Sequence, residues 1–378
     1  MVRARLRQVL RVRLRRDGLR VRRPGLGRGT GGADPVSAAL EIVEVRPGDD
    51  AGLRAWADVV AASLRHEIGR HATPWLAEEL AVVAQEPDGL RRDAFHLGLV
   101  DGEPVAAGWL ALRLLDNLDG AQVDVHVLPA HRRQGYGGQV LDRLEEIAAR
   151  DGRSRFDARA QWPHDGPTDG AGTPGIAFAA RRGYRFGIGE VQRELDLPVA
   201  EERLAALAAA AAPHHAAYRI EAWRGPVPDA LVAGWLAVSS TLTTEAPSGA
   251  VEREAESADI AAFRQREAIQ ARQRRTSWHA VALAGDGEVV AYSELVLPSY
   301  DTDWVHQWGT LVRRDHRGHR LGAALKVANL RGLQRDADVA SRRVVTWNAE
   351  ENGPMIDINE ELGFVPRARS AELQRRAG

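Results

Sequence analysis

The sequence predicts an α/β fold with a mixed, α+β-type sheet, built twice in tandem. One short motif occurs twice, as RRQGYG at residues 132–137 and as RGHRLG at residues 317–322. The copies lie 185 residues apart, which is too long for a solenoid repeat and fits a duplicated domain. Each copy follows a β-rich run and opens a helix-like pattern. The repeated element order predicts a mixed sheet with helices on both faces.

In the first half, apolar periodicity and turn signals define the expected elements. We expect strands at 40–45, 96–100, 105–114, 121–127 and 156–160, and helices at 49–64, 74–84 and 135–150. The turn at 101–103 makes a hairpin of the second and third strands. Residues 164–174 are rich in turn formers and are expected to form a loop.

The second half repeats this order. We expect strands at 218–223, 278–284, 289–297, 304–312 and 344–348, and helices at 228–239, 257–274, after 322 and at 354–362. The turn at 285–287 joins a second hairpin. Residues 200–212 are Ala-rich, have high helix propensity and are expected to connect the halves.

These patterns divide the chain into an extension (1–37), a first domain (38–197), a helical linker (198–214) and a second domain (215–378). A chain of 378 residues with 44% hydrophobic content suffices for two cores. The extension has 11 Arg against two Asp, a charge of +9, and the remainder has a charge of −10. We expect the extension to be disordered; a targeting segment, a nucleic-acid arm or a membrane-surface helix is the alternative.

Composition excludes several classes of chemistry. There is no Cys, and therefore no disulfide framework, thiolate nucleophile or Cys-ligated metal. No apolar run reaches transmembrane length, and the Arg-rich start lacks the apolar stretch of a secretory signal. The basic residues are almost all Arg, and Lys326 is the only lysine. This composition favours a GC-rich bacterial genome, and we expect a cytoplasmic location.

Each motif has the features of an anion-binding loop. A strand that ends in Val127 or Val312 runs into a turn and then a helix N-terminus, whose free backbone N–H groups can bind a phosphate. Glycine lets the backbone approach such a group because it has no Cβ. In the second copy Arg320 replaces Gly135. This replacement costs local backbone freedom and is tolerable if the position keeps a negative φ, and the Arg320 guanidinium could pair with a phosphate.

The pattern Arg-x-x-Gly-x-Gly after a Val-ended strand resembles the acetyl-CoA loop of the GNAT N-acetyltransferase superfamily. Gly183-Tyr184 and Gly363-Phe364 stand where such folds turn before their last strands, and residues 347–352 resemble the strand and Asn before the fourth helix. The resemblance covers roughly residues 40–197 and 215–376 and, having two copies, is more specific than one hexapeptide. It implies acetyl-CoA as co-substrate, no metal, and acyl transfer by direct attack.

The resemblance also implies which residues hold the cofactor. The splayed strand before each loop would bind the pantetheine arm through its backbone, and the loop would bind the phosphates. In the first domain the expected residues are Val125, His126, Val127, Arg132, Arg133, Gln134, Gly135, Tyr136, Gly137 and Gly138. In the second domain they are Thr310, Leu311, Val312, Arg317, Gly318, His319, Arg320, Leu321, Gly322, Ala323 and Asn352.

Histone-type members of the superfamily carry a glutamate base eleven residues before the loop, and many members carry a Tyr acid four residues before the late Gly. The position of the glutamate base is His306 in the second domain and Ala121 in the first. The position of the Tyr acid is Asn359 in the second domain and Ala179 in the first. His306 and Asn359 are therefore the expected catalytic residues. As alternatives, His306 fills space in its strand and Asn359 lies on an exposed polar face.

Asn352 matches the helix-start Asn of the family, where the first domain has Gly172; its alternative role is helix capping. From these features we expect the second domain to catalyse and the first to be a degenerate scaffold. Four carboxylates between the first two helices of the second domain could attract a cationic amine or form a solvated loop. They are Glu245, Glu252, Glu254 and Glu256.

The predicted function is an N-acetyltransferase that moves an acetyl group from acetyl-CoA to the primary amine of a small molecule. We expect a monomer that is a pseudo-dimer, or a homodimer, with no nucleic-acid or membrane partner. The tandem layout is also similar to that of the mycothiol synthases, but no residue selects their acceptor. Two alternatives remain: a CoA-binding sensor or scaffold, favoured by the missing Tyr, and a nucleic-acid binder that depends on the Arg-rich extension.

Overall fold

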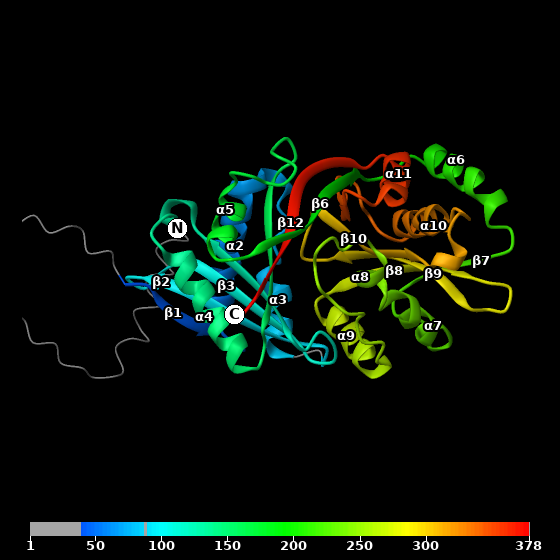
Figure 1. The fold of residues 1–378 in the computed structure, drawn as a ribbon. Coiled ribbons are helices and arrows are strands. Elements are labelled where there is room, and N and C mark those ends of the chain that lie inside the picture. The colour runs from blue at the N-terminus through cyan, green and yellow to red at the C-terminus, as the bar shows by residue number, and fades with distance from the viewer. Residues whose placement is uncertain (1–38, 87–88, 378) are drawn as a thin grey trace, which may run out of the picture. The chain divides into compact units, whose positions relative to one another are not determined.

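The computed structural model describes residues 39–86 and 89–377, and Figure 1 shows their fold. In this part of the chain twelve strands form one sheet, in the order β1-β2-β3-β4-β5-β12-β6-β11-β10-β9-β8-β7. Two neighbouring pairs are parallel, β4 with β5 and β10 with β11, and the other pairs are antiparallel. The mixed sheet predicted from the sequence is confirmed. The expected extension, 1–37, lies outside the described residues.

The first half contains β1 (Glu41–Val45), α2 (Asp50–Ile68), α3 (Ala77–Gln85), β2 (Arg91–Val100), β3 (Glu103–Arg113), β4 (Gly120–Val127), α4 (Tyr136–Arg150), β5 (Arg155–Pro163), α5 (Pro174–Arg181) and β6 (Arg185–Asp196). The connecting helix is α6 (Glu201–Ala211). The second half contains β7 (Arg219–Arg224), α7 (Asp229–Ser239), α8 (Leu242–Glu245), α9 (Ile260–Arg272), β8 (Arg275–Leu283), β9 (Val289–Pro298), β10 (Trp304–Val312), α10 (Leu321–Asp336), β11 (Arg343–Ala349), α11 (Gly353–Leu362) and β12 (Val365–Arg376).

Strand alternation gives the sheet two buried faces. In β3, Ala106 packs in a core with α4, whereas its neighbour Ala107 packs in a core with α2. The second half follows the same rule, because Leu330 of α10 and Trp235 of α7 belong to different cores. Helices therefore cover both faces, as a two-sided apolar sheet requires.

Local sequence explains where the helices near the site begin. The Asp49 side chain caps α2 by accepting a hydrogen bond from the Gly52 backbone N–H (3.1 Å). Leu53, Trp56 and Val60 then recur at helical spacing and are buried. The Trp56 indole N–H also donates to the carbonyl oxygen of Gly108 in β3 (2.9 Å), which fixes α2 on the sheet.

The two halves exchange their last strands. β6 pairs with β11 of the second half, and β12 lies between β5 and β6, as Figure 1 shows (β12 in red, β6 in green). Ala371 of β12 faces Ala160 of β5, and Glu194 of β6 faces Val345 of β11. The expected boundaries at 38–197 and 215–378 stay a prediction about domains, since the described chain forms one compact unit.

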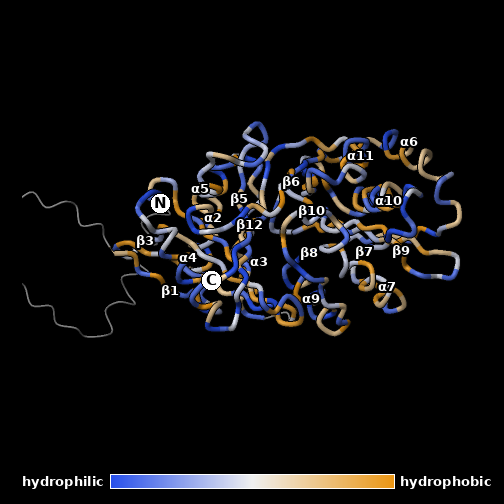
Figure 2. The backbone as a smooth tube through the Cα atoms, viewed as in Figure 1, coloured by the Kyte–Doolittle hydropathy of each residue, from blue (hydrophilic) through white to orange (hydrophobic). Residues whose placement is uncertain are grey.

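β12 is an inner strand with the polarity of a surface strand. Figure 2 shows it as mostly hydrophilic. Four of its five charged side chains form ion pairs within the described residues, for example Arg375 with Glu145 and Glu372 with Arg253. These pairs allow a polar strand to occupy the middle of the sheet.

Candidate active site

Both copies of the repeated motif have the same backbone. The second and fourth positions have positive φ in each copy: Arg133 (+65°) and Gly135 (+86°) in the first, Gly318 (+86°) and Arg320 (+52°) in the second. Each copy thus has Gly at one left-handed position and Arg at the other. The condition of a negative φ at Arg320 is not met, because this loop has the left-handed conformation there, at a cost of about 1–2 kcal/mol for an L-residue.

Each loop ends at an uncapped helix N-terminus. Gly135 and Arg320 are the N-cap residues of α4 and α10, and neither helix start has a side-chain cap hydrogen bond. The backbone N–H groups of the first turn therefore lack a side-chain acceptor at this point. Together with the helix dipole they favour an anion.

The leading Arg of each motif binds protein groups. The Arg132 Nε donates to the carbonyl oxygen of Val127 (3.2 Å), and the Arg317 Nε donates to that of Val312 (3.1 Å). Each guanidinium also forms an ion pair with a glutamate, Arg132 with Glu67 and Arg317 with Glu245. This geometry gives both residues a role in holding the loop against the strand end.

β4 and β5 form a fork beside the first loop. They pair only through residues 120–122 and 155–157, whereas β5 pairs with β12 on its other edge along its whole length, residues 155–163. A cavity of about 1220 Å³ is lined by residues 122–127 of β4, residues 159–161 of β5 and the first loop. The fork thus opens into a space that reaches the helix N-terminus of α4.

The second half supplies another wall of this cavity. Its contributions come from the segment before α9, from α9 itself, and from β8, β10 and β11. These lining residues are Glu256, Arg266, Ile269, Gln270, Gln273, Arg275, His306, Trp308 and Trp347. Sequence reasoning missed this wall, since no local pattern in α9 indicates that it contacts the other half.

Asp124 and His126 form a polar pair on β4. Val123 and Val125 pack in the core with α4, so alternation directs Asp124 and His126 to the opposite face. The His126 Nε2 lies 3.0 Å from Asp124 Oδ2, and both residues line the cavity. Sequence analysis named His126 only as a cofactor contact and did not propose Asp124. The period-two alternation was the available signal.

His306 lies in the cavity wall rather than in an open site of its own. Its ring lies 5.8 Å from the ring of Trp75, and only 7% of the residue is exposed. Burial, together with the charge of Arg275, lowers the pKa of His306 to about 3. The imidazole is therefore neutral at physiological pH and, with so low a pKa, a weak proton acceptor.

A second fork lies between β10 and β11, which pair only through residues 304–306 and 343–345. A buried polar chain lies in this half: the Lys326 Nζ donates to Asn359 Oδ1 (2.7 Å), and the Asn359 Nδ2 donates to Asn348 Oδ1 (2.6 Å). Asn359 is fully buried, so its exposed-face alternative is wrong. Its role in catalysis stays a prediction.

At the corresponding places the first half is apolar. Leu141 lies six residues after the N-cap of α4, as Lys326 lies six after that of α10. Ala179 lies four residues before Gly183, as Asn359 lies four before Gly363. The two halves therefore have the same backbone arrangement but different side chains at these positions, apolar in the first half and polar in the second.

The predicted cofactor residues divide between these two places. Those that line the cavity are Val125, His126, Val127, Arg132, Arg133, Gly135, Tyr136, Gly137 and Gly138; Gln134 is exposed beside them. Those of the second half, Thr310, Leu311, Val312, Arg317, Gly318, His319, Arg320, Leu321, Gly322, Ala323 and Asn352, do not line it. Whether either set contacts acetyl-CoA stays a prediction.

Several residues of the second set have protein partners. Thr310 Oγ1 lies 2.9 Å from Ser293 Oγ, and the His319 Nδ1 lies 3.0 Å from the His214 carbonyl oxygen. Asn352 is the N-cap residue of α11, but its side chain makes no capping hydrogen bond.

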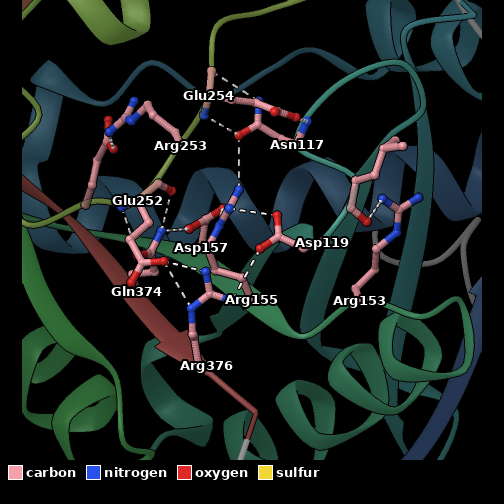
Figure 3. A network of polar contacts seen from close by, with 12 residues as sticks. Asn117, Asp119, Arg153, Arg155, Asp157, Glu252, Arg253, Glu254, Gln374 and Arg376 are labelled. Carbon is pink, nitrogen blue, oxygen red and sulfur yellow. Dashed lines mark hydrogen bonds and ion pairs between the residues drawn. The ribbon is translucent and has the colours of Figure 1, made fainter.

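The four glutamates before α9 are engaged. Glu245 pairs with Arg314 and Arg317, as described for the second loop. Figure 3 shows the following segment lying against the first half and the end of β12: Glu252 pairs with Arg376, and the Glu254 carboxylate accepts from the Asn117 backbone N–H. Of the four, Glu256 lines the cavity. The segment is a strap between halves rather than a free acidic loop.

Among residues 39–86 and 89–377, no group of three or more His, Asp or Glu side chains could hold a metal ion. No helix in these ranges combines the length and the apolar character that crossing a bilayer requires.

Comparisons with known proteins agree with this geometry. Residues 61–164 match the model of the Acetyltransferase (GNAT) family. The uncharacterized N-acetyltransferase YjcF of Bacillus subtilis (strain 168) is 33% identical over 113 residues, which span 29% of this chain and 70% of YjcF. A solved tandem GNAT protein from the clavulanic acid biosynthesis pathway, without AcCoA, is 26% identical, with a TM-score of 0.69 over 90% of this chain and 99% of its own.

A second solved structure, a GCN5-related N-acetyltransferase from Sphaerobacter thermophilus, is 16% identical and shares the fold, with a TM-score of 0.56 over 89% of this chain and 95% of its own. The loop and fork occur in both halves of the chain, and the family match falls on the half whose loop lines the cavity. The chain belongs to the GNAT acetyltransferase family, in a tandem arrangement.

Proposed function

We propose that this protein transfers an acetyl group from acetyl-CoA to the primary amine of a small molecule, and that the reaction takes place beside the first loop. The observation that carries the proposal is the continuous cavity that joins the first loop, the β4–β5 fork and the Asp124–His126 pair. A cavity with an acid/base pair beside an anion-binding loop favours turnover over a sensor or scaffold.

The residues of the first loop fit the cofactor. The uncapped N-terminus of α4 offers backbone N–H groups to a pyrophosphate. Arg133 and Arg181 line the cavity and have no ion-pair partner within the described residues, so their guanidinium groups are available for phosphates. When bound there, acetyl-CoA would supply the thioester, and the unpaired edge of β4 would bind its pantetheine arm.

The Asp124–His126 pair is the group we assign to proton transfer. An acceptor arrives as an ammonium, which the Asp124 carboxylate attracts, and the neutral His126 imidazole takes its proton. The amine nitrogen then forms a bond to the acetyl carbon and the carbon–sulfur bond breaks. The proton that the nitrogen loses as it becomes an amide is taken up by the departing sulfur. Asp124 orients the imidazole and offsets the charge that it gains.

In this proposal the second half has the supporting role, the reverse of the expectation from sequence. Its loop does not line the cavity, and Lys326, Asn359 and Asn348 lie where the first half is apolar. Its contribution is the wall of the acceptor cavity, which includes His306. A base with a pKa of about 3 would hold a proton poorly at neutral pH.

The test is an amine-panel acetylation screen read by CoA release, with variants of both halves. We expect His126→Ala to lower turnover by about 10²–10⁴-fold and Asp124→Asn to lower it by about 10-fold or more. Neither variant should change CoA affinity much. His306→Ala should change turnover by less than about 10-fold. If instead His306→Ala abolishes turnover and His126→Ala retains it, the second half catalyses and our proposal is wrong.

A further inference from the structure

The charges that line the cavity almost cancel in pairs. Six of its seven carboxylates form ion pairs with Arg side chains, for example Glu79 with Arg275 and Glu67 with Arg132. The seventh carboxylate is Asp124, whose partner is His126. Paired groups are already neutralised by the protein, so the unpaired groups indicate what a ligand must bring.

Three of the nine lining arginines have no ion-pair partner among the described residues: Arg133, Arg181 and Arg266. Arg133 belongs to the first loop and Arg181 is the last residue of α5, so we assign both to the side of the cavity where the cofactor is proposed to bind. Arg266 instead comes from α9 on the wall of the second half, and its guanidinium lies 5.9 Å from the centre of the Trp308 ring.

Arg266 shares its helix face with two glutamines. Residues 266, 270 and 273 are one and two helical turns apart, and all three line the cavity. The Gln273 Nε2 is fixed by donating to the carbonyl oxygen of Glu79 (3.1 Å). No hydrogen bond within the described chain holds Gln270, so its amide is available one turn from Arg266.

One carboxylate that interacts with the charge of Arg266 is Glu294 of β9. It forms no ion pair within 4 Å with Arg266, although the positive charge of Arg266 lowers its pKa. Burial is the larger influence and raises the pKa of Glu294 to about 7. Glu294 is therefore only partly ionised at neutral pH and does not neutralise Arg266 fully.

We propose that the acceptor is a small zwitterion, with its amino group towards Asp124 and a carboxylate bound by Arg266 and Gln270. The inference rests on the proposed function, because it assumes that the cavity binds the acceptor. A single guanidinium matches one carboxylate in charge and in bidentate geometry, whereas a phosphate dianion would leave one charge unmatched. The rings of Trp75 and Trp308 line the same wall and suit an apolar linker.

The experiment compares three matched acceptor series of increasing chain length: ω-amino acids, their ω-amino amides and the n-alkylamines, each read by CoA release. We expect kcat/KM for the best amino acid to exceed that for its amide by about 10²-fold. Arg266→Met should raise KM for the acid by about the same factor and leave the amide and alkylamine unchanged. Arg264→Met is the matched control, since Arg264 is on the same helix but pairs with Asp229 and Glu267 outside the cavity.

The outcomes separate the two proposals. If no series is acetylated by a protein that binds CoA, the proposed function fails. If amides and alkylamines react as well as acids and Arg266→Met changes nothing, the zwitterion is wrong and the function stands. If Arg266→Met lowers kcat/KM equally for all three series and also lowers thermal stability, Arg266 is a structural counter-ion of Glu294 and the zwitterion inference is wrong. If Glu294→Gln leaves the preference for amino acids over amides unchanged, the result supports the inference.

Discussion

Replacing the single lysine with Met should make the protein more stable at mildly acidic pH and less stable at alkaline pH. Lys326 is 2% exposed, and within the described part of the chain its one hydrogen bond is to Asn359 Oδ1. Burial lowers the pKa of Lys326 to about 7, from an ordinary value near 10.5. Met has a similar length and no charge, so it fills the same space without the cost of burying an ammonium.

The pKa gives the size and sign of the effect. At about 1.36 kcal/mol for each pKa unit, a fall from 10.5 to about 7 corresponds to about 5 kcal/mol. The unfolded lysine keeps its proton up to pH 10.5, whereas the folded one releases it above about pH 7. The free energy of unfolding therefore rises with pH over this window. The charge-burial cost is fully present below pH 7 and disappears near pH 10.5.

Lys326→Met also leaves Asn359 Oδ1 without its donor, which costs about 1–3 kcal/mol at any pH. The variant should therefore be more stable than the parent protein by about 2–4 kcal/mol at pH 6. At pH 10 about 1 kcal/mol of the charge-burial cost remains, so the variant should be less stable by up to about 2 kcal/mol. Urea unfolding midpoints at both pH values measure the difference, and the remaining titratable groups cancel in the comparison.

The pKa itself can be measured directly. Because the chain has one lysine, ¹⁵N-lysine labelling gives one side-chain signal, and its titration should centre near pH 7. A titration near pH 10.5, or a variant equally destabilised at pH 6 and pH 10, would refute the argument.

Two other predictions concern the cofactor and the junction of the halves. Gly137→Asp puts a carboxylate at the N-terminus of α4 and should abolish CoA binding. Gly322→Asp should leave the stoichiometry of CoA binding, measured by calorimetric titration, unchanged. The opposite pattern would show that the cofactor binds at the second loop. Glu194 is buried between His71 (2.7 Å) and Arg343 (2.8 Å), so Glu194→Ala should cost about 3–5 kcal/mol in urea unfolding. The exposed pair of Glu201 and Arg331 is the control, and Glu201→Ala should cost less than about 1 kcal/mol.

The parts of the fold that depend on local signals could be predicted from the sequence. The two loops, the helices after them and the hairpins follow from Gly positions and apolar periodicity, and their order identified the mixed sheet. Element ends were less accurate: β2 begins at Arg91, five residues before the expected strand, and the expected helix 257–274 is α9, Ile260–Arg272.

Features that depend on distant contacts could not be predicted. The sequence of β12, VPRARSAELQRR, has the polarity of an edge strand, and only its ion pairs explain an inner position. The cavity combines β4 with α9, whose residues have no shared local pattern. Asp124 was within reach, because alternation along β4 directs it to the same face as His126.

The exchange of β6 and β12 has a consequence for synthesis on the ribosome. β5 has its antiparallel partner only when β12 is present, and β12 follows all the other described strands along the chain. The first half therefore cannot complete its sheet while the second half is being translated, and the edge of β5 stays open to other chains during that time. A nascent chain that is cut short before residue 365 would keep this edge of β5 unpaired, so the sheet of the first half is complete only after β12 has been synthesised.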